Sequence, residues 1–227
     1  YILEYIDNKV NTEYDVKRFL NLPVISVVPR LSKEVLLTEA PVKSKLSEMF
    51  NISTTLIKSA AQEANKQLFL ISSAKPEEGK TTISINVAVS MARKGVQTIL
   101  LDSDLHKPHI HNVFGLSNSL GLSTLLQEDV FKAEDFDIEA AAQIVQNYML
   151  PIPNFQALTV IPAGPSVPEP VALLESLEMQ RLLKTLREVC DIAILDSPPI
   201  IDVGDTLVLA TLADSVMDPT RSALAGS

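Results

Sequence analysis

The length of 227 residues and the hydrophobic content of 46% suit one α/β-sized core with an appended arm. A single cysteine, Cys190, excludes an internal disulfide, so we expect a buried core residue in a reducing compartment. The 19 basic and 28 acidic residues give a net charge of −9, which disfavours a broad nucleic-acid-binding surface. No apolar run reaches the roughly 18 residues that span a bilayer, so we expect the chain as given to be soluble.

The first third of the chain is predicted to contain an arm and one long helix. Residues 1–41 form the arm, in which Asn11 and Thr12 can cap a short amphipathic helix and residues 22–29 have the pattern of a strand. Apolar residues then recur near the helical period from residue 42 to residue 65. We therefore expect a helix over 42–65 that packs its apolar face against the rest of the chain.

Short apolar runs without alternation mark the remaining strands, which is typical of strands buried on both faces. The predicted strands are residues 68–72, 98–102, 158–162 and 191–196. The predicted helices between them are residues 81–95, with Gly95 as a natural stop, and residues 170–189. The stretch 127–153 is rich in acids and is predicted to be an irregular surface excursion without a ligand. This alternation predicts an α/β fold with a mostly parallel central sheet flanked by helices.

The strongest motif begins directly after the first of these strands and opens a helix. Residues 74–81, AKPEEGKT, have the spacing of a phosphate-binding loop with Ala in place of the first Gly. In such a loop the backbone N–H groups surround the phosphates, Lys80 reaches the β and γ oxygens, and the Thr81 hydroxyl suits Mg²⁺. The predicted nucleotide-binding residues are Ala74, Lys75, Pro76, Glu77, Glu78, Gly79, Lys80, Thr81 and Thr82. The expected architecture is thus a three-layer P-loop NTPase fold.

Two further strands end in acids at the same edge of the predicted sheet. One ends in Asp102-Ser103-Asp104, and the last ends in Asp196, which suits a Walker B acid that supports Mg²⁺. Paired carboxylates are justified where a divalent cation and a reacting hydroxyl share their charge. The predicted catalytic residues are Lys80, Asp102 and Asp104, and the predicted metal ligands are Thr81, Asp102 and Asp196. Together the three strand ends predict a nucleotide-dependent phosphoryl-transfer site.

These motifs make the chain resemble the cytoplasmic kinase domain of the bacterial tyrosine kinases that control capsule and exopolysaccharide synthesis. The resemblance rests on SSAKPEEGKTT, LLDSDLHKPHIHNVFGLSNSLGLSTLL, VIPAGPSVPEPVALLES and AILDSPPIIDVGDTLVLATLADSV, and it covers residues 68–216. The arm is similar to the segment that follows the second transmembrane helix in fused members. Residues 42–216 are then the kinase domain, and we expect residues 217–227 to be a truncated or foreign tail.

The resemblance implies an ATP-dependent protein-tyrosine kinase that phosphorylates a neighbouring copy within a ring-like homo-oligomer. It implies that Lys80 contacts phosphate, that Thr81 and Asp196 serve Mg²⁺, and that Asp102 or Asp104 acts on the incoming tyrosine hydroxyl. The implied partners are ATP and ADP, copies of the chain, and a membrane activator or fused transmembrane domain, with no nucleic acid. The implied location is the cytoplasmic face of the bacterial membrane.

Several positions depart from the pattern of this family. Glu77 stands where the loop usually has Gly, which constrains the backbone. His106 and Lys107 replace a usual pair of arginines and so weaken bidentate phosphate binding. In the segment EMFNISTTL, Asn51 and Ser53 occupy arginine positions of the oligomerisation motif, so Glu48 lacks the charged partners used in ring assembly.

The tyrosines also differ from expectation, because the chain holds only four, Tyr1, Tyr5, Tyr14 and Tyr148, with no C-terminal cluster. Two alternatives therefore stay open. One is a partitioning ATPase of the MinD/ParA type, whose signature lysine would be Lys75, although the Pro and Glu residues of the loop do not match it. The other is a catalytically weak subunit of the same family that binds nucleotide and regulates polymer export.

Overall fold

The computed structural model describes residues 24–25, 36–38, 44–200 and 205–219. The short helix predicted after Asn11 and Thr12 lies outside the described residues. The strand predicted over residues 22–29 also lies outside them, apart from residues 24 and 25.

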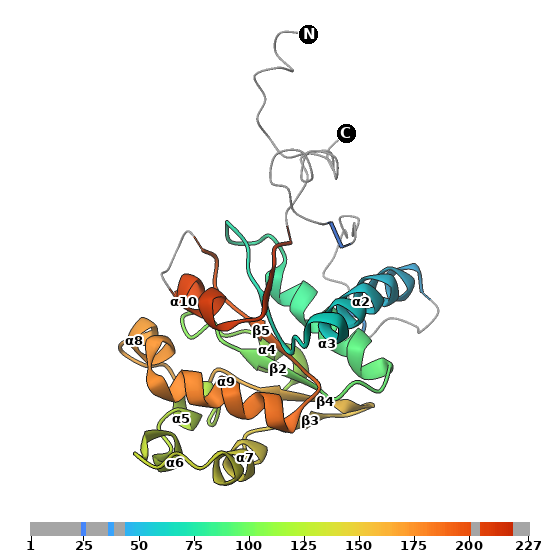
Figure 1. Cartoon of the computed structure of the whole chain (residues 1–227). Coiled ribbons are helices and arrows are strands. Elements are labelled where there is room, and N and C mark those ends of the chain that lie inside the picture. Colours follow the sequence, from blue (N-terminus) through green and yellow to red (C-terminus); the bar gives the residue numbers. More distant parts are fainter. Residues whose placement is uncertain (1–23, 26–35, 39–43, 201–204, 220–227) are drawn as a thin grey trace.

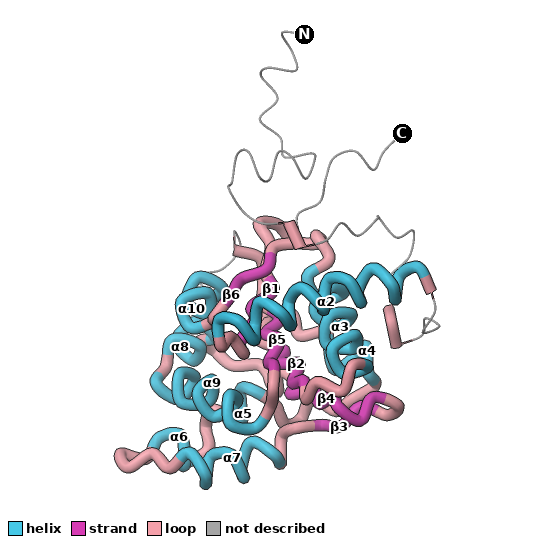
Figure 2. Tube along the Cα trace, turned by 45° about the vertical axis from the view of Figure 1, so that its right-hand side comes forward, coloured by secondary structure: helices cyan, strands magenta, loops and turns pink. Residues whose placement is uncertain are grey.

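A six-stranded sheet forms the centre of the structure (Figure 1), and its strands lie in the order β3-β4-β2-β5-β1-β6 (Figure 2). The strands are β1 (Leu68–Ile71), β2 (Thr98–Asp102), β3 (Leu150–Ile152), β4 (Phe155–Ile161), β5 (Ile192–Asp196) and β6 (Ser215–Met217). All neighbouring strands run parallel except β3, which is antiparallel to β4. The mostly parallel sheet predicted from the sequence is confirmed.

Nine helices are described, and they cover the sheet on both faces. They are α2 (Lys45–Ala64), α3 (Lys80–Arg93), α4 (Ile110–Phe114), α5 (Leu122–Leu125), α6 (Asp129–Lys132), α7 (Ile138–Gln146), α8 (Pro170–Glu175), α9 (Leu177–Val189) and α10 (Asp205–Leu212). Figure 2 shows α2, α3 and α4 on one side of the strands and α5 to α10 on the other. The three-layer α/β architecture is therefore also confirmed.

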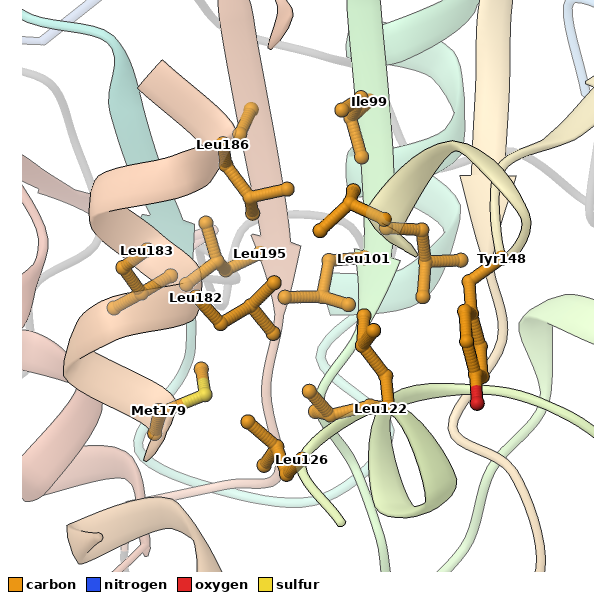
Figure 3. Close-up of a cluster of buried hydrophobic side chains, with 14 of the residues drawn as sticks. Ile99, Leu101, Leu122, Leu126, Tyr148, Met179, Leu182, Leu183, Leu186 and Leu195 are labelled. Atoms are coloured by element: carbon orange, nitrogen blue, oxygen red, sulfur yellow. The ribbon is translucent and has the colours of Figure 1, made fainter. Parts of the chain in front are cut away.

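Successive apolar residues of the central strands β1, β2 and β5 alternate between two separate hydrophobic clusters, because strand side chains point to opposite faces. Leu68 and Leu70 of β1 join the cluster under α9, whereas Phe69 and Ile71 join the cluster under α2 and α3. Figure 3 shows part of the first cluster, where leucines of α9 meet Leu101 and Leu195 of the sheet. Since both faces are covered, the central strands read as continuous apolar runs.

The helix predicted over residues 42–65 is α2, and its ends follow local capping chemistry. The Ser44 hydroxyl accepts a hydrogen bond from the Ser47 N–H at 3.1 Å, which satisfies one of the unpaired donors of the first turn. Asn65 ends the helix in the left-handed conformation, with φ of 50°. Gly95, the predicted stop after α3, also has a positive φ of 74°.

The prediction of an irregular stretch over residues 127–153 is wrong. The segment forms α6, α7 and β3, and Phe131, Ala141 and Val145 are fully buried in the cluster under α9. The acids that dominate its composition are mostly exposed, as expected of a solvated face. The apolar residues between these acids form a buried stripe. Through this stripe α6 and α7 pack beside α9 and extend the helical layer on this face of the sheet.

The single helix predicted over residues 170–189 is divided at Ser176. This residue is extended, with φ of −67° and ψ of 160°, so it cannot continue α8. Its hydroxyl instead accepts a hydrogen bond from the Met179 N–H at 3.2 Å and begins α9. A serine inside an apolar helical pattern thus acts as an N-cap.

The last described strand, β6, is short and partly exposed. Val216 is 48% exposed, and β6 forms the edge of the sheet beside β1. Met217, which was assigned to a tail, pairs with Ile71. Just before β6, Asp214 accepts hydrogen bonds from the Gln67 and Leu68 N–H groups at 2.8 Å each and forms an ion pair with Arg187 at 2.7 Å. These bonds hold the edge strand to the start of β1.

Candidate nucleotide-binding and phosphotransfer site

The predicted site residues meet at the carboxyl ends of three neighbouring strands. In the sheet register, Asp196 of β5 lies opposite Asp102 of β2 on one side and opposite Ile71 of β1 on the other. The loop that carries the phosphate-binding motif leaves β1 at this edge and leads into α3 at Lys80. The topology therefore brings all three predicted elements together, as expected for parallel strands whose carboxyl ends share one edge.

The loop before α3 is held by bonds within itself. The Ser73 hydroxyl donates to the Lys75 carbonyl at 2.7 Å, and the Lys75 N–H donates to Glu78 Oε2 at 2.9 Å. Gly79 precedes the helix with φ of 91°, a conformation that suits glycine. No side-chain cap hydrogen bond is made at the start of this 14-residue helix, and helix starts of this kind bind anions through their N–H groups.

Glu77 adopts a backbone conformation that disfavours any residue with a Cβ. Its φ is 61°, in the left-handed region, which costs a non-glycine residue about 1–2 kcal/mol. This glutamate stands at the position where the resemblance led us to expect Gly, and the residue is exposed. The constraint expected from the sequence is therefore present in the backbone.

Replacing Glu77 by Gly is expected to relieve this strain and to remove a carboxylate from the phosphate-binding loop. The melting temperature should rise modestly, because the gain of about 1 kcal/mol is partly offset by the greater freedom of Gly in the unfolded chain. ADP should bind several-fold more tightly in calorimetric titration. Glu77→Gln is the matched control, since it removes the charge but keeps the Cβ. Unchanged stability and affinity in Glu77→Gly would contradict the assignment.

Asp196 is buried at the end of β5 and is bound from α3. It is 2% exposed, and its Oδ2 accepts a hydrogen bond from the Thr81 hydroxyl at 2.8 Å. Its Oδ1 accepts one from the Ser84 hydroxyl at 2.7 Å. The pairing of Thr81 with Asp196 brings together two of the predicted metal ligands. The sequence motifs did not predict a role for Ser84. Its position, about one helical turn after Thr81, places it on the same face of α3 and could have indicated this contact.

Asp102 and Asp104 differ in accessibility and in what their oxygens contact. Asp102 is 1% exposed, and its Oδ2 accepts the N–H groups of His109 and Ile110 at 3.2 and 3.1 Å. Asp104 is half-buried, and its Oδ1 accepts the N–H groups of His106 and Lys107 at 3.1 and 2.9 Å. Asp102 thus organises the loop into α4, while Asp104 holds the turn that carries the two residues replacing the arginines.

Burial of two acids at adjacent strand ends raises both of their pKa values. Loss of hydration is the main cause of the raised pKa of Asp102, which lies well above its usual value, and the charge of Asp196 adds to it. Burial likewise raises the pKa of Asp196 to about 6, despite the hydrogen bonds from Ser84 and Thr81. The edge of the sheet therefore carries an electrostatic cost that a bound cation would offset.

This cost predicts that the free protein becomes less stable as the pH rises. Between the ordinary carboxyl pKa of 3.8 and about 6, Asp196 keeps its proton in the folded state but loses it in the unfolded state. Stability is therefore full below this window and falls as the pH rises through it. We expect a lower melting temperature at about pH 7.5 than at about pH 4.5, and a smaller difference in Asp196→Asn. An equal pH dependence in both proteins would contradict the raised pKa of Asp196.

The residues at this edge fit a magnesium ion. Within the described residues, no group of three His, Cys, Asp or Glu side chains could hold a metal by itself. The edge nevertheless offers the Thr81 hydroxyl and carboxylate oxygens, the hard ligands that Mg²⁺ prefers when it is also bound to phosphates and water.

A mostly apolar hollow of ≈ 520 Å³ lies away from this edge. It is lined mainly by residues of α8 and the preceding loop, and none of the predicted site residues lines it.

Comparison with known proteins places this site in a family. The chain is 34% identical over 185 residues to the tyrosine-protein kinase YwqD of Bacillus subtilis, covering 82% of this chain and 72% of that protein. The chain belongs to the bacterial tyrosine kinases. The chain is also 32% identical over 167 residues to the putative tyrosine-protein kinase EpsB of Ralstonia nicotianae. That match covers 74% of this chain but only 20% of the length of EpsB.

A solved structure also resembles this chain over most of its length. The crystal structure of the chimerical protein CapA2B2 superposes with a TM-score of 0.76 at 31% identity, covering 91% of this chain and 84% of that one.

A family model described as ParA, NUBPL iron-transfer P-loop NTPase, matches residues 64–217. Iron–sulfur clusters need several cysteine thiolates, whereas this chain has one cysteine, Cys190. That thiol is buried as expected, and burial raises its pKa to about 12. The match to the iron-transfer model thus reflects the shared P-loop fold.

Proposed function

We propose that this domain transfers the γ-phosphoryl group of ATP to a protein tyrosine, on a neighbouring copy of the chain, in the control of capsule or exopolysaccharide synthesis. The observation that carries the proposal is the bond between Thr81 and Asp196 beside the paired acids Asp102 and Asp104, within a bacterial tyrosine-kinase domain. One relative, 30% identical over 185 residues, is named a putative tyrosine-protein kinase in the cps region of Klebsiella pneumoniae.

The proposed nucleotide-binding residues are the loop 74–79 and the first turn of α3 through Thr82. Backbone N–H groups of this turn bind phosphate oxygens, and Lys80 neutralises the charge that develops during transfer. Thr81 and Asp196 would hold Mg²⁺, with Asp102 close by in the sheet register. When bound, this ion supplies charge neutralisation at the β and γ oxygens.

Asp104 is the acid that we assign to the tyrosine hydroxyl. It is more accessible than Asp102, whose carboxylate holds the backbone of the following loop. The tyrosine oxygen forms a bond to the γ-phosphorus as the bond to the β–γ bridging oxygen breaks, and ADP leaves. The hydroxyl proton passes to the Asp104 carboxylate.

The acceptor tyrosine is not Tyr148. Its side chain is 7% exposed, and its hydroxyl donates to Glu128 Oε1 at 2.5 Å. A phosphoryl group there would lie buried beside a carboxylate, which is unfavourable. The other three tyrosines, Tyr1, Tyr5 and Tyr14, lie outside the described residues.

We propose that self-association differs from the ring implied by the resemblance. The Asn51 side chain accepts a hydrogen bond from Ser90 at 3.2 Å, and its carbonyl accepts one from Lys94 at 2.7 Å. Ser53 is 6% exposed and donates to the Met49 carbonyl at 3.0 Å. The polar groups at the two replaced arginine positions are thus bonded within the chain, which leaves Glu48 without a charged partner from them.

A membrane partner and a place at the cytoplasmic face of the membrane are part of the same proposal. None of the helices in the described part of the chain has the length and apolar character that a membrane crossing requires. The proposed link is therefore a membrane activator or a fused transmembrane domain joined through the N-terminal arm, residues 1–41. The proposed kinase domain is residues 42–216.

Incubation with labelled ATP, Mg²⁺ and a tyrosine-rich acceptor peptide tests the proposed reaction. We expect label on tyrosine, and its loss in Asp104→Asn and in Asp102→Asn. Ser117→Ala, a change at an exposed serine outside the site, should leave transfer unchanged. Tight ATP binding without any labelled tyrosine would contradict the proposal.

A second candidate, a nucleotide-switched ATPase, is favoured by the match to the ParA family model and by Lys75 at the signature position. Lys75 is exposed. Its side chain could therefore reach the nucleotide of a second copy, but only in a dimer whose two nucleotide sites face each other. An ATP-induced dimer that is lost in Lys75→Ala would favour the switch. A larger ring, or phosphotyrosine, would favour the kinase.

A further inference from the structure

Ser84 is a buried hydroxyl that contacts the proposed site without belonging to any predicted part of it. The residue is fully buried on α3, and its Oγ lies 2.7 Å from Asp196 Oδ1. Thr81, three residues earlier on the same face of the helix, lies 2.8 Å from Asp196 Oδ2. One helix face thus bonds both oxygens of a single carboxylate.

The Ser84 hydroxyl has one proton and two possible acceptors. Its Oγ is also 3.0 Å from the Lys80 carbonyl, the common helical back-bond of a serine. An ionised carboxylate is the stronger acceptor, and its distance is the shorter of the two. The proton therefore goes to Asp196 when this acid is charged, which is the state that a cation site requires.

Two bonds to two oxygens fix the rotation of a carboxylate. The backbone of Asp196 is held as well, because its carbonyl accepts the N–H and the hydroxyl of Ser103 at 2.9 and 2.6 Å. With Oδ1 bonded to Ser84, the oxygen that remains beside Thr81 is Oδ2. Outer hydrogen-bond partners of this kind orient metal ligands, and their loss typically lowers metal affinity roughly 10- to 100-fold.

We propose that Ser84 is a positioning residue that orients Asp196 toward a divalent cation bound with the nucleotide. This inference rests on the proposed function, since it assumes that Thr81 and Asp196 form the cation site. Because Ser84 is fully buried and reaches the site only through Asp196, we expect its effect to be specific to the cation-dependent part of nucleotide binding. A purely structural serine would instead affect stability or all nucleotide binding alike.

Calorimetric titration with ADP, in excess Mg²⁺ and in excess chelator, separates these roles. In Ser84→Ala we expect ADP affinity in chelator to stay within about twofold of the original, while the enhancement by Mg²⁺ falls roughly 10-fold. Ser84→Thr, which keeps the hydroxyl, should restore the enhancement. Ser90→Ala is the matched control: Ser90 is 1% exposed on the same helix but bonds Thr54 and Asn51 of α2.

The melting temperatures of all variants are measured in parallel. A comparable loss of stability in Ser84→Ala and Ser90→Ala, with loss of the Mg²⁺ effect only in the former, supports the proposal. Full Mg²⁺ enhancement in Ser84→Ala overturns it, and so does an equal loss of ADP affinity with and without Mg²⁺. If the unchanged protein shows no Mg²⁺ enhancement, the cation site of the proposed function fails together with this inference.

Discussion

Replacing Lys80 by Met is expected to reduce phosphotyrosine formation roughly 100- to 1,000-fold, the usual cost of losing one main charge-stabilising group. Lys80 is the first residue of α3 and is only 8% exposed. Its positive charge is also close enough to Asp196 to lower the pKa of that acid. Methionine has a side chain of similar length but no charge. It therefore neither stabilises the charge that develops during transfer nor lowers the pKa of Asp196.

The measurement for Lys80→Met is the rate of label transfer to a tyrosine-rich peptide at saturating ATP. Lys184→Met is the matched control, because this lysine is exposed on α9 and belongs to no part of the proposed site. The melting temperature should be preserved, since a buried methionine needs no charged partner. A rate within a few-fold of the original would show that Lys80 does not take part in phosphoryl transfer.

Replacing Gly121 by Ala is expected to destabilise the fold strongly. An added Cβ would overlap the Pro162 carbonyl and the Gly164 nitrogen, and both are backbone atoms that cannot rotate away. The two segments are also joined by hydrogen bonds here. The Leu122 N–H donates to the Pro162 carbonyl at 2.7 Å, and the Ser123 N–H donates to the Ala163 carbonyl at 2.8 Å. We expect a cost of about 3 kcal/mol, the upper end for overpacking a core.

Urea unfolding of Gly121→Ala measures this cost, and Gly115→Ala provides the contrast. Gly115 has φ of 64° but open space around the position of a Cβ, so only backbone strain of about 1 kcal/mol is expected there. Equal losses in the two variants would mean that the close approach at Gly121 is relieved by a shift of the loop after β4.

Much of the fold and of the site could be predicted because motif and context agreed. The apolar runs gave β1, β2, β4 and β5, and the loop spacing located α3, since each is a strong local signal. The sequence also indicated the strain at Glu77, because a glutamate stands where only Gly is free of cost.

What the sequence did not reveal has physical causes in particular residues. Acids dominate the composition of residues 127–153, so the spacing of Phe131, Ala141 and Val145 was not recognised as the buried stripe of α6 and α7. Ser84 looks like any helical serine until the register shows that it faces Asp196, a residue 112 positions away in the chain. Such long-range pairing is not visible from local patterns.

One reaction tests the central claim most directly, in which phosphotyrosine and inorganic phosphate are counted together. The protein is incubated with ATP, Mg²⁺ and acceptor peptide, alongside Lys75→Met and Lys80→Met. A tyrosine kinase should form phosphotyrosine in excess over free phosphate. Its rate should fall at most a few-fold in Lys75→Met, which keeps the backbone of the loop, and roughly 100- to 1,000-fold in Lys80→Met. Release of phosphate alone, abolished by Lys75→Met, would contradict the assignment and identify a switch ATPase.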